Sequence, residues 1–218
     1  MVWLSQLKTT TLKNLEIIGG IIALLTYIPL GLLVKKEPKI HSFASWAMFA
    51  VLDYITAWML WSEGGNWLLV LFLALGCTSI SILLLYARAV RWGAFESFTL
   101  LLVFLVCIVW ILYGNTIGAI AGIIANVTAG APQFKDSWKI PDARLIPIWF
   151  LFVIANTCVF FAGEGWGREA FIEERLYPLF LGLFGVAMSI TTLISLKKKN
   201  RTSLFDLLWN AIFIRSNH

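Results

Sequence analysis

Long apolar runs alternate with short polar segments along almost the whole chain. Each run has about 20 residues, the length that an α-helix needs to cross the hydrocarbon layer of a bilayer. A helix also satisfies its own backbone hydrogen bonds, which lipid requires. The pattern predicts an all-α integral membrane protein with seven transmembrane helices, over residues 15–34, 43–62, 67–87, 95–113, 116–134, 144–162 and 177–196.

Composition supports lipid as the natural solvent of the chain. Of its 218 residues, 60% are hydrophobic and 13% are charged, and the mean hydropathy is +0.84. A soluble domain carries about 25% charged residues. We therefore expect the lipid bilayer as a partner, and we interpret the net charge of +5 as a topology signal and not as a nucleic-acid-binding surface.

Basic residues concentrate in alternate loops. One set of loops and the C-terminal segment hold Lys35, Lys36, Lys39, Arg88, Arg91, Lys135, Lys139, Arg144, Lys197, Lys198, Lys199, Arg201 and Arg215. The other set holds the acids Glu63, Glu164, Glu169, Glu173 and Glu174. The positive-inside rule then predicts an N-terminus outside and a C-terminus in the cytoplasm. For the tail, 197–218, apolar residues at helical spacing leave two readings open, an interfacial helix or a disordered segment.

The chain also contains an internal repeat with an offset of 103 positions. Matching positions pair Pro29 with Pro132, Pro38 with Pro141, Trp46 with Trp149, Phe49 with Phe152, and Asp53 with Asn156. The chain has only six prolines, and four of them are in these pairs. We therefore predict two related units.

The units are 15–87 and 116–196, each with three spans, and 88–115 contains span four as a linker. A single linking helix makes two three-helix units parallel, so that an axis along the membrane normal relates them.

The repeat and a short motif carry a resemblance to a known family. The stretch "APQFKDSW" contains Pro132-Gln133, whereas the first unit has Pro29-Leu30 in "YIPLGLLVK". The chain resembles the PQ-loop superfamily, which includes SWEET, SemiSWEET and cystinosin-like transporters, and is most similar to a bacterial branch without an assigned substrate. The resemblance implies a transporter of a small polar solute, such as a sugar or an amino-acid-like molecule, by alternating access in a bacterial inner membrane.

The paired prolines predict hinges. Proline lacks an N–H, so Pro29 and Pro132 should each kink a helix and free a carbonyl group. Packing kinks are the alternative, and the pairing favours hinges. Gln133 could bond a freed carbonyl or close an inner gate, and Tyr27 completes the set of candidate hinge and gate residues.

Asp53 is the acid nearest to the centre of a predicted span. A carboxylate there is costly, by about 2.5–3.5 kcal/mol on insertion scales, and should face the bundle interior. We interpret Asp53 as a proton-coupling or substrate-binding group. The alternative is a structural Asp bonded to a Tyr or Trp of a neighbouring helix, for example Tyr27 or Tyr113.

Trp46, Phe49 and Asp53 share one helical face by their spacing. Residues with the same spacing in the second unit are Trp149, Phe152 and Asn156, and Asn126 lies mid-way along span five. Facing each other, these residues would form a substrate pocket with aromatic walls. The alternative for Trp46 and Trp149 is a place in the interfacial aromatic belts.

Other chemistry has weaker support in the sequence. Cys77, Cys107 and Cys158 are isolated in apolar runs, and neither His41 nor His218 has a metal-ligand spacing. We expect no metal, no cofactor and no enzyme activity. Two alternatives to a sugar or amino-acid transporter stay open: an importer of a vitamin precursor of the nicotinamide riboside type, and a non-transporting receptor or assembly protein. A homo-oligomer also stays open.

Overall fold

The computed structural model describes residues 2–62, 67–113, 115–163, 166–168 and 171–200. Within these ranges the chain is all-helical, has no strand and contains seven α-helices. They are α1 (Val2–Lys36), α2 (Phe43–Ser62), α3 (Leu68–Tyr86), α4 (Ala94–Tyr113), α5 (Asn115–Lys139), α6 (Leu145–Ala162) and α8 (Leu176–Asn200). A short 3-10 helix, η1 (Pro38–Ile40), precedes α2, and a π-helical turn, η2 (Phe171–Arg175), precedes α8.

Six of these helices, all but α5, are long and apolar enough to cross a membrane by their length and composition. The all-α membrane character predicted from the sequence is therefore confirmed. Helix α5 has a more mixed composition because alanines, glycines and polar residues such as Asn126, Thr128 and Gln133 interrupt its apolar positions. Asn126 and Gln133 are buried in the protein interior, so they do not meet lipid.

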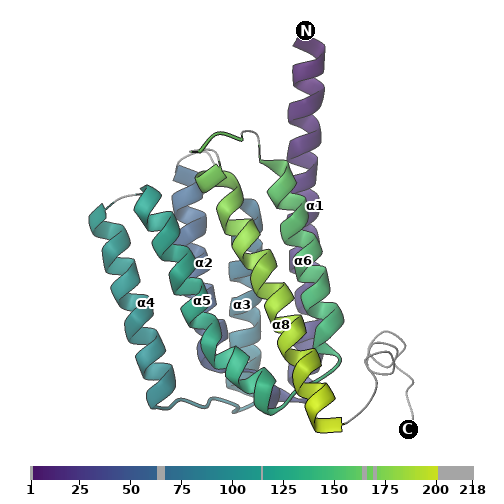
Figure 1. The fold of residues 1–218 in the computed structure, drawn as a ribbon, viewed down its shortest axis with the longest axis vertical. Helices are drawn as coiled ribbons and strands as arrows, with labels where there is room; N and C mark the ends of the chain where they lie inside the picture. Colours follow the sequence, from purple (N-terminus) through teal and green to yellow (C-terminus); the bar gives the residue numbers. More distant parts are fainter. Residues whose placement is uncertain (1, 63–66, 114, 164–165, 169–170, 201–218) are drawn as a thin grey trace.

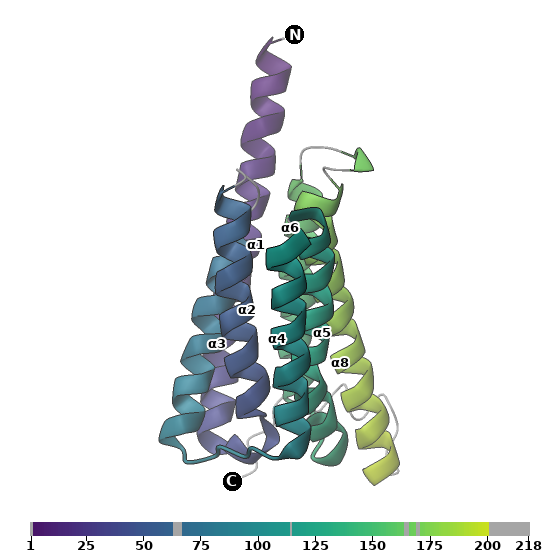
Figure 2. The same cartoon turned by 90° about the vertical axis from the view of Figure 1, so that its left-hand side faces the viewer.

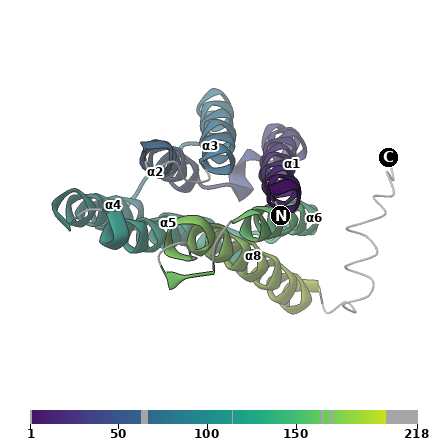
Figure 3. The same cartoon turned by 90° about the horizontal axis from the view of Figure 1, so that it is seen from above.

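The helices stand side by side and alternate in direction along the chain (Figures 1 and 2). Helix α3 packs between α1 and α2, and α8 packs between α5 and α6. Contacts of α1 with α6 and of α2 with α5 close these six helices into a ring (Figure 3). Helix α4 lies outside the ring and packs mainly against α5.

Small residues allow close contact between helices of the ring. A Cβ atom on Gly19 of α1 would lie 2.6 Å from the Val159 side chain and 2.8 Å from the carbonyl oxygen of Ala155 on α6. Glycine therefore lets the two backbones approach, as in other tightly packed membrane helices. Large apolar side chains such as Ile28, Trp58 and Ile111 remain exposed on the outer faces, as a lipid-facing surface requires.

Three helices extend well beyond the spans predicted for them. Helix α1 begins at Val2 and not near residue 15, and its first turns project beyond the bundle (Figure 1). Helices α5 and α8 continue to Lys139 and Asn200, past the predicted ends at 134 and 196. Apolarity marks only the part of a helix that lies in lipid, whereas the helix itself continues into polar surroundings.

Both paired prolines lie inside continuous helices. Pro29 is within α1 and is exposed on its outer face, whereas Pro132 is within α5 and is buried. Beyond Pro132 the backbone N–H of Gln133 donates to Ser45 Oγ of α2 at 3.1 Å. A bond to a neighbouring helix thus compensates for the local disturbance of the helical ladder.

One end of the bundle carries the basic residues that close α1, α5 and α8. Ion pairs join loops and helices there: Arg91 with Asp136 at 2.9 Å and Lys135 with Glu96 at 3.1 Å. His41 is fully buried at this end, and burial lowers the pKa of its imidazole to about 4. Of the predicted tail, 197–218, the first four residues belong to α8, and 201–218 lie outside the described residues, as do Glu63, Glu164 and Glu169.

Candidate functional site

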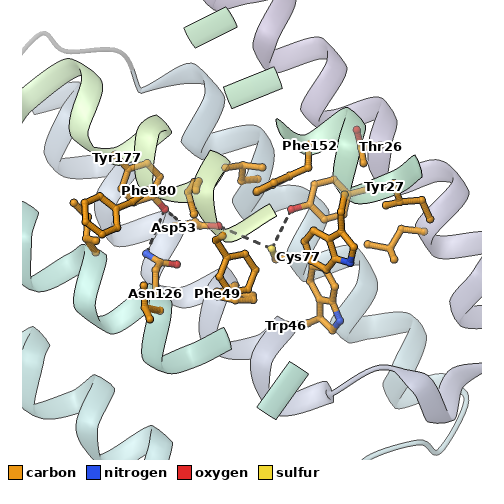
Figure 4. Close-up of a pocket in the computed structure, with 18 residues that line it drawn as sticks. Thr26, Tyr27, Trp46, Phe49, Asp53, Cys77, Asn126, Phe152, Tyr177 and Phe180 are labelled. Atoms are coloured by element: carbon orange, nitrogen blue, oxygen red, sulfur yellow. Dashed lines mark hydrogen bonds between the residues drawn. The ribbon is translucent and has the colours of Figure 1, made fainter. Parts of the chain in front are cut away.

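A cavity lies inside the ring of helices, and side chains from all six ring helices line it. Helix α1 contributes Tyr27, and α3 contributes Cys77 on the same side of the cavity (Figure 4). Among the described residues, α4 contributes none. The cavity is therefore enclosed by α1, α2 and α3 on one side and by α5, α6 and α8 on the other.

The structure brings together most of the residues that the sequence suggested for a pocket. They are Trp46, Phe49, Asp53, Asn126, Trp149 and Phe152. Tyr27, grouped above with the hinge and gate residues, also lines the cavity. Residues 103 positions apart thus face the same space from α2 and α6.

Asn156 is placed differently from the prediction. It is fully buried, but the residues that line the central cavity do not include it. Its amide donates to the carbonyl oxygen of Phe152 on its own helix, at 2.8 Å. An amide can bond back to its own helix in this way because it carries a donor, whereas an ionised Asp53 can only accept.

Aromatic rings form the wall of the cavity. The indoles of Trp46 and Trp149 are stacked, with centroids 6.3 Å apart and planes within 9°. They are 3% and 4% exposed, so they belong to the core and not to an interfacial belt. Phe184 approaches Trp149 edge-on at 5.8 Å, and Tyr27 approaches Trp46 edge-on at 6.2 Å. The two halves of the ring therefore meet through an aromatic cluster.

A chain of polar contacts crosses the cavity from α5 to α1 (Figure 4). The Asn126 amide donates to the Tyr177 hydroxyl at 3.3 Å, and Tyr177 donates to Asp53 Oδ1. The Cys77 thiol approaches Asp53 Oδ2 at 3.9 Å and lies 3.2 Å from the Tyr27 hydroxyl. Five helices thus contribute one polar group each, and Asp53 is at the centre.

The structure corrects the predicted partner of Asp53. Tyr177 bonds the carboxylate directly, whereas Tyr27 reaches it only through Cys77. The other suggested partner, Tyr113, is on α4 and is 64% exposed. Tyr177 is the second residue of α8, and the basic residues are in the last turn of this helix. The Asp53–Tyr177 bond therefore lies toward the end of the bundle opposite to the basic residues.

Several buried polar groups of the cavity have no partner among the described residues. They are Trp46 Nε1, Trp149 Nε1 and Asn126 Oδ1. Buried polar groups in proteins are nearly always hydrogen-bonded, and each unpartnered one costs about 1–3 kcal/mol. Three of them around one cavity indicate a place where a ligand or water completes the bonding.

The cavity is narrow in this conformation. About 40 Å³ is open to the centres of water-sized molecules, which is room for a few waters only. A larger ligand requires the walls to move apart.

Gln133 holds a second contact between the two sides of the ring, at the basic end. It is fully buried, and its Oε1 accepts from the backbone N–H of Ser42 at 2.9 Å. Its Nε2 donates to the carbonyl oxygen of Ile40 and to Ser137 Oγ, both at 3.4 Å. Gln133 therefore ties α5 to the start of α2 and does not bond the carbonyl that Pro132 frees.

Sequence reasoning missed Tyr177, and it treated Cys77 only as an apolar thiol. Neither could be found by the repeat, because their counterparts 103 positions away are Ala74 and Phe180. Their role depends on which helices are neighbours. That information is absent from the periodicity of any single helix.

Among the described residues, no group of His, Cys, Asp and Glu side chains could hold a metal ion. Comparisons of the chain with protein-family models, with curated proteins and with solved structures found no match. The site must therefore be interpreted from its own geometry.

Proposed function

We propose that the chain is a membrane transporter that moves a small polar solute by alternating access. In this proposal α1–α3 and α5, α6 and α8 form two parallel three-helix units, and α4 is the linker between them. All seven helices cross the membrane. The motif resemblance noted above makes the PQ-loop superfamily the proposed family, with a bacterial inner membrane as the proposed location.

One observation carries the proposal. A central cavity has a chain of polar contacts across it, aromatic walls, and lining residues from all six ring helices. Small-molecule sites commonly have such largely apolar walls with a few placed polar groups. In parallel-repeat transporters the substrate site likewise lies near the membrane midplane, between the repeats.

Two separate links between the units supply candidate gates. The Asp53–Tyr177 bond joins α2 to α8 toward one end, and Gln133 joins α5 to Ser42 and Ile40 at the basic end. Both links are made in this conformation, and in the proposal breaking one of them at a time opens the cavity to one side. Pro29 and Pro132 are the proposed hinges, and the basic end is the proposed cytoplasmic side.

The Asp53–Tyr177 link also suggests how a proton could be coupled to transport. Ionised Asp53 accepts a hydrogen bond from Tyr177. Adding a proton to Asp53 removes its negative charge and turns one oxygen into a donor, which weakens its attraction for the Tyr177 hydroxyl. Protonation would therefore favour opening at this end, and a pH gradient would drive the cycle.

The test is flux into proteoliposomes, with a panel of sugars, amino acids and amines, measured with and without a pH gradient. We expect at least one solute to move, and we expect Asp53→Asn to reduce that flux by 10-fold or more and to abolish its dependence on the gradient. Glu96→Gln is the matched control, since Glu96 pairs with Lys135 on the far side of α5 from the cavity. If no solute moves, or if Asp53→Asn transports like the unmodified protein, the proposal fails.

A further inference from the structure

The charge of the cavity lining restricts the solute. Among the residues that line it, Asp53 is the only acid, and there is no Lys, Arg or His. In a buried, low-dielectric site a lone carboxylate attracts a cation strongly and repels an anion. This inference rests on the proposed function, because it takes the cavity as the substrate site.

The groups around Asp53 match the donors of an amine. Asn126 Oδ1 is buried beside the polar chain without a partner, so it can accept a hydrogen bond. Asp53 has two carboxylate oxygens, and each oxygen can accept more than one bond. A protonated primary amine has three N–H donors, which these oxygens satisfy.

The aromatic walls favour the same kind of ligand. Trp46 and Phe49 precede Asp53 on one face of α2, and Phe152 and Trp149 line the cavity from α6. Phe49 lies about one helical turn from Asp53, and the face of an aromatic ring attracts a cation by about 0.5–2 kcal/mol, with the higher values at desolvated sites. The methylene groups of a linear amine would also pack against these rings.

The opposite end of the cavity offers hydrogen-bond donors. Trp46 Nε1 and Trp149 Nε1 are both buried and unpartnered, and because the two indoles are stacked these donors belong to one region of the wall. An indole N–H can only donate, so it suits a carboxylate, carbonyl or hydroxyl oxygen.

The two ends of the cavity are well separated. Trp46 and Asp53 are seven positions apart on α2, which corresponds to about 10 Å along a helix axis. Figure 4 likewise places the labelled Trp46 away from the Asp53–Tyr177 link. The amino group and the acceptor group of one ligand must therefore be several bonds apart.

We propose that the solute is a linear amino compound, with a protonated amino group held by Asp53 and Asn126 and a hydrogen-bond acceptor at its other end held by Trp46 and Trp149. A neutral sugar leaves the carboxylate without a charged partner, and a simple anion meets Asp53 with the wrong sign.

Isothermal titration calorimetry on the purified full chain in detergent micelles tests the proposal with four probes. 6-Aminohexanoate carries both groups, hexylamine only the amine, hexanoate only the acceptor, and glucose is neutral and polar. We expect 6-aminohexanoate to bind tightest, hexylamine to bind at least 3-fold more weakly, and hexanoate and glucose to bind at least 30-fold more weakly than 6-aminohexanoate.

Two variants assign the two ends. Asp53→Asn should weaken both amines by 10-fold or more, and Glu96→Gln should leave both affinities unchanged. Trp46→Phe keeps an aromatic ring but removes one N–H donor, so it should weaken 6-aminohexanoate toward the affinity of hexylamine and leave hexylamine as it was. The four probes on the unmodified chain decide the charge preference even if a variant does not fold.

Stronger binding of hexanoate or glucose than of the amines overturns this inference, and so does unchanged amine binding by a folded Asp53→Asn variant. Flux of glucose or of an anion in proteoliposomes, without amine binding, overturns the amine assignment and leaves the transporter proposal standing. Amine binding without flux of any solute overturns the transporter proposal and leaves the amine assignment standing.

Discussion

Helices α1 and α5 carry prolines 103 positions apart, yet the buried residue that follows the proline makes a different kind of contact in each helix. Leu30 follows Pro29 and packs as an apolar side chain in the core. Gln133 follows Pro132 and makes hydrogen bonds to α2 and to the segment before it. Related sequence positions thus hold the ring together by packing on one side and by a polar link on the other.

The aromatic packing shows the same inequality. Gly76 of α3 lies directly against the ring of Tyr27 from α1, and Gly130 of α5 lies directly against Phe184 from α8. On one side the glycine belongs to the third helix and the ring to the first, and on the other side this is reversed. The two halves of the ring therefore both pack a glycine against an aromatic ring, but the helices that supply the two groups are exchanged.

The largest expected effect comes from making the second proline helix resemble the first, with Gln133→Leu. The change leaves the backbone N–H of Ser42 and the carbonyl of Ile40 without this partner, at about 1–3 kcal/mol for each buried group. We expect the free energy of unfolding in detergent to fall by about 3 kcal/mol.

Ser137→Ala is the control for this change, because it removes only the 3.4 Å contact with Gln133 Nε2. It should cost less than about 1 kcal/mol. A Gln133→Leu variant as stable as the Ser137→Ala variant would show that the two proline helices are held equivalently.

Much of the fold was predictable because the length of an apolar run can be read from the local sequence. The predicted span 43–62 coincides with α2, and the predicted ends of α3, α4 and α6 are within one residue of those in the structure. The ends of α1, α5 and α8 were not predictable, since polar residues continue a helix without an apolar signal. The run 116–134 was predicted as a span in the same way as the others, although α5 is the one described α-helix that is not apolar enough to count as a candidate span.

The cavity was predictable only in part, for the same reason. Helical spacing placed Trp46, Phe49 and Asp53 on one face, and the offset supplied their counterparts on α6. The bond from Tyr177 to Asp53 depends on α8 lying across from α2, which no local pattern encodes. Asn156 does not line the cavity although its spacing matches that of Asp53, and its Nδ2 donates to the carbonyl of Phe152 on its own helix.

A smaller effect is expected from His41, which corresponds to Arg144 at the same offset. His41 is buried without a partner among the described residues, and burial lowers its pKa from 6.5 to about 4. Arg144 is partly exposed, and its hydrogen bond with Asp142 raises its pKa. The two positions therefore differ in their response to acid.

The sign of the effect follows from linkage. Below pH 6.5 the unfolded chain binds a proton at His41 that the folded chain does not bind until about pH 4. Neutral, buried His41 therefore contributes fully to the free energy of unfolding above pH 6.5. About 2–3 kcal/mol of that free energy is lost as the pH falls toward 4. His41→Leu should flatten the dependence of the unfolding free energy on pH between 6.5 and 4, and a slope that persists in the variant would assign it to other groups.

The smallest expected effect tests whether Asn156 is a functional counterpart of Asp53. Asn156 lies outside the central cavity, and its Oδ1 has no hydrogen-bond partner among the described residues. Its Nδ2 bonds to the carbonyl of Phe152, which also belongs to the helical ladder. Removing the amide with Asn156→Ala therefore removes one weak bond and one unpartnered acceptor together, and alanine is the better helix former. We expect the melting temperature to change by less than 3 °C, which corresponds to roughly 1 kcal/mol or less for a chain of this size. We also expect solute flux in proteoliposomes to stay within 2-fold of that of the unmodified protein. A 10-fold loss of flux, comparable with that expected for Asp53→Asn, would mean that the second half of the ring uses this position during transport and that the halves exchange roles as the cavity opens.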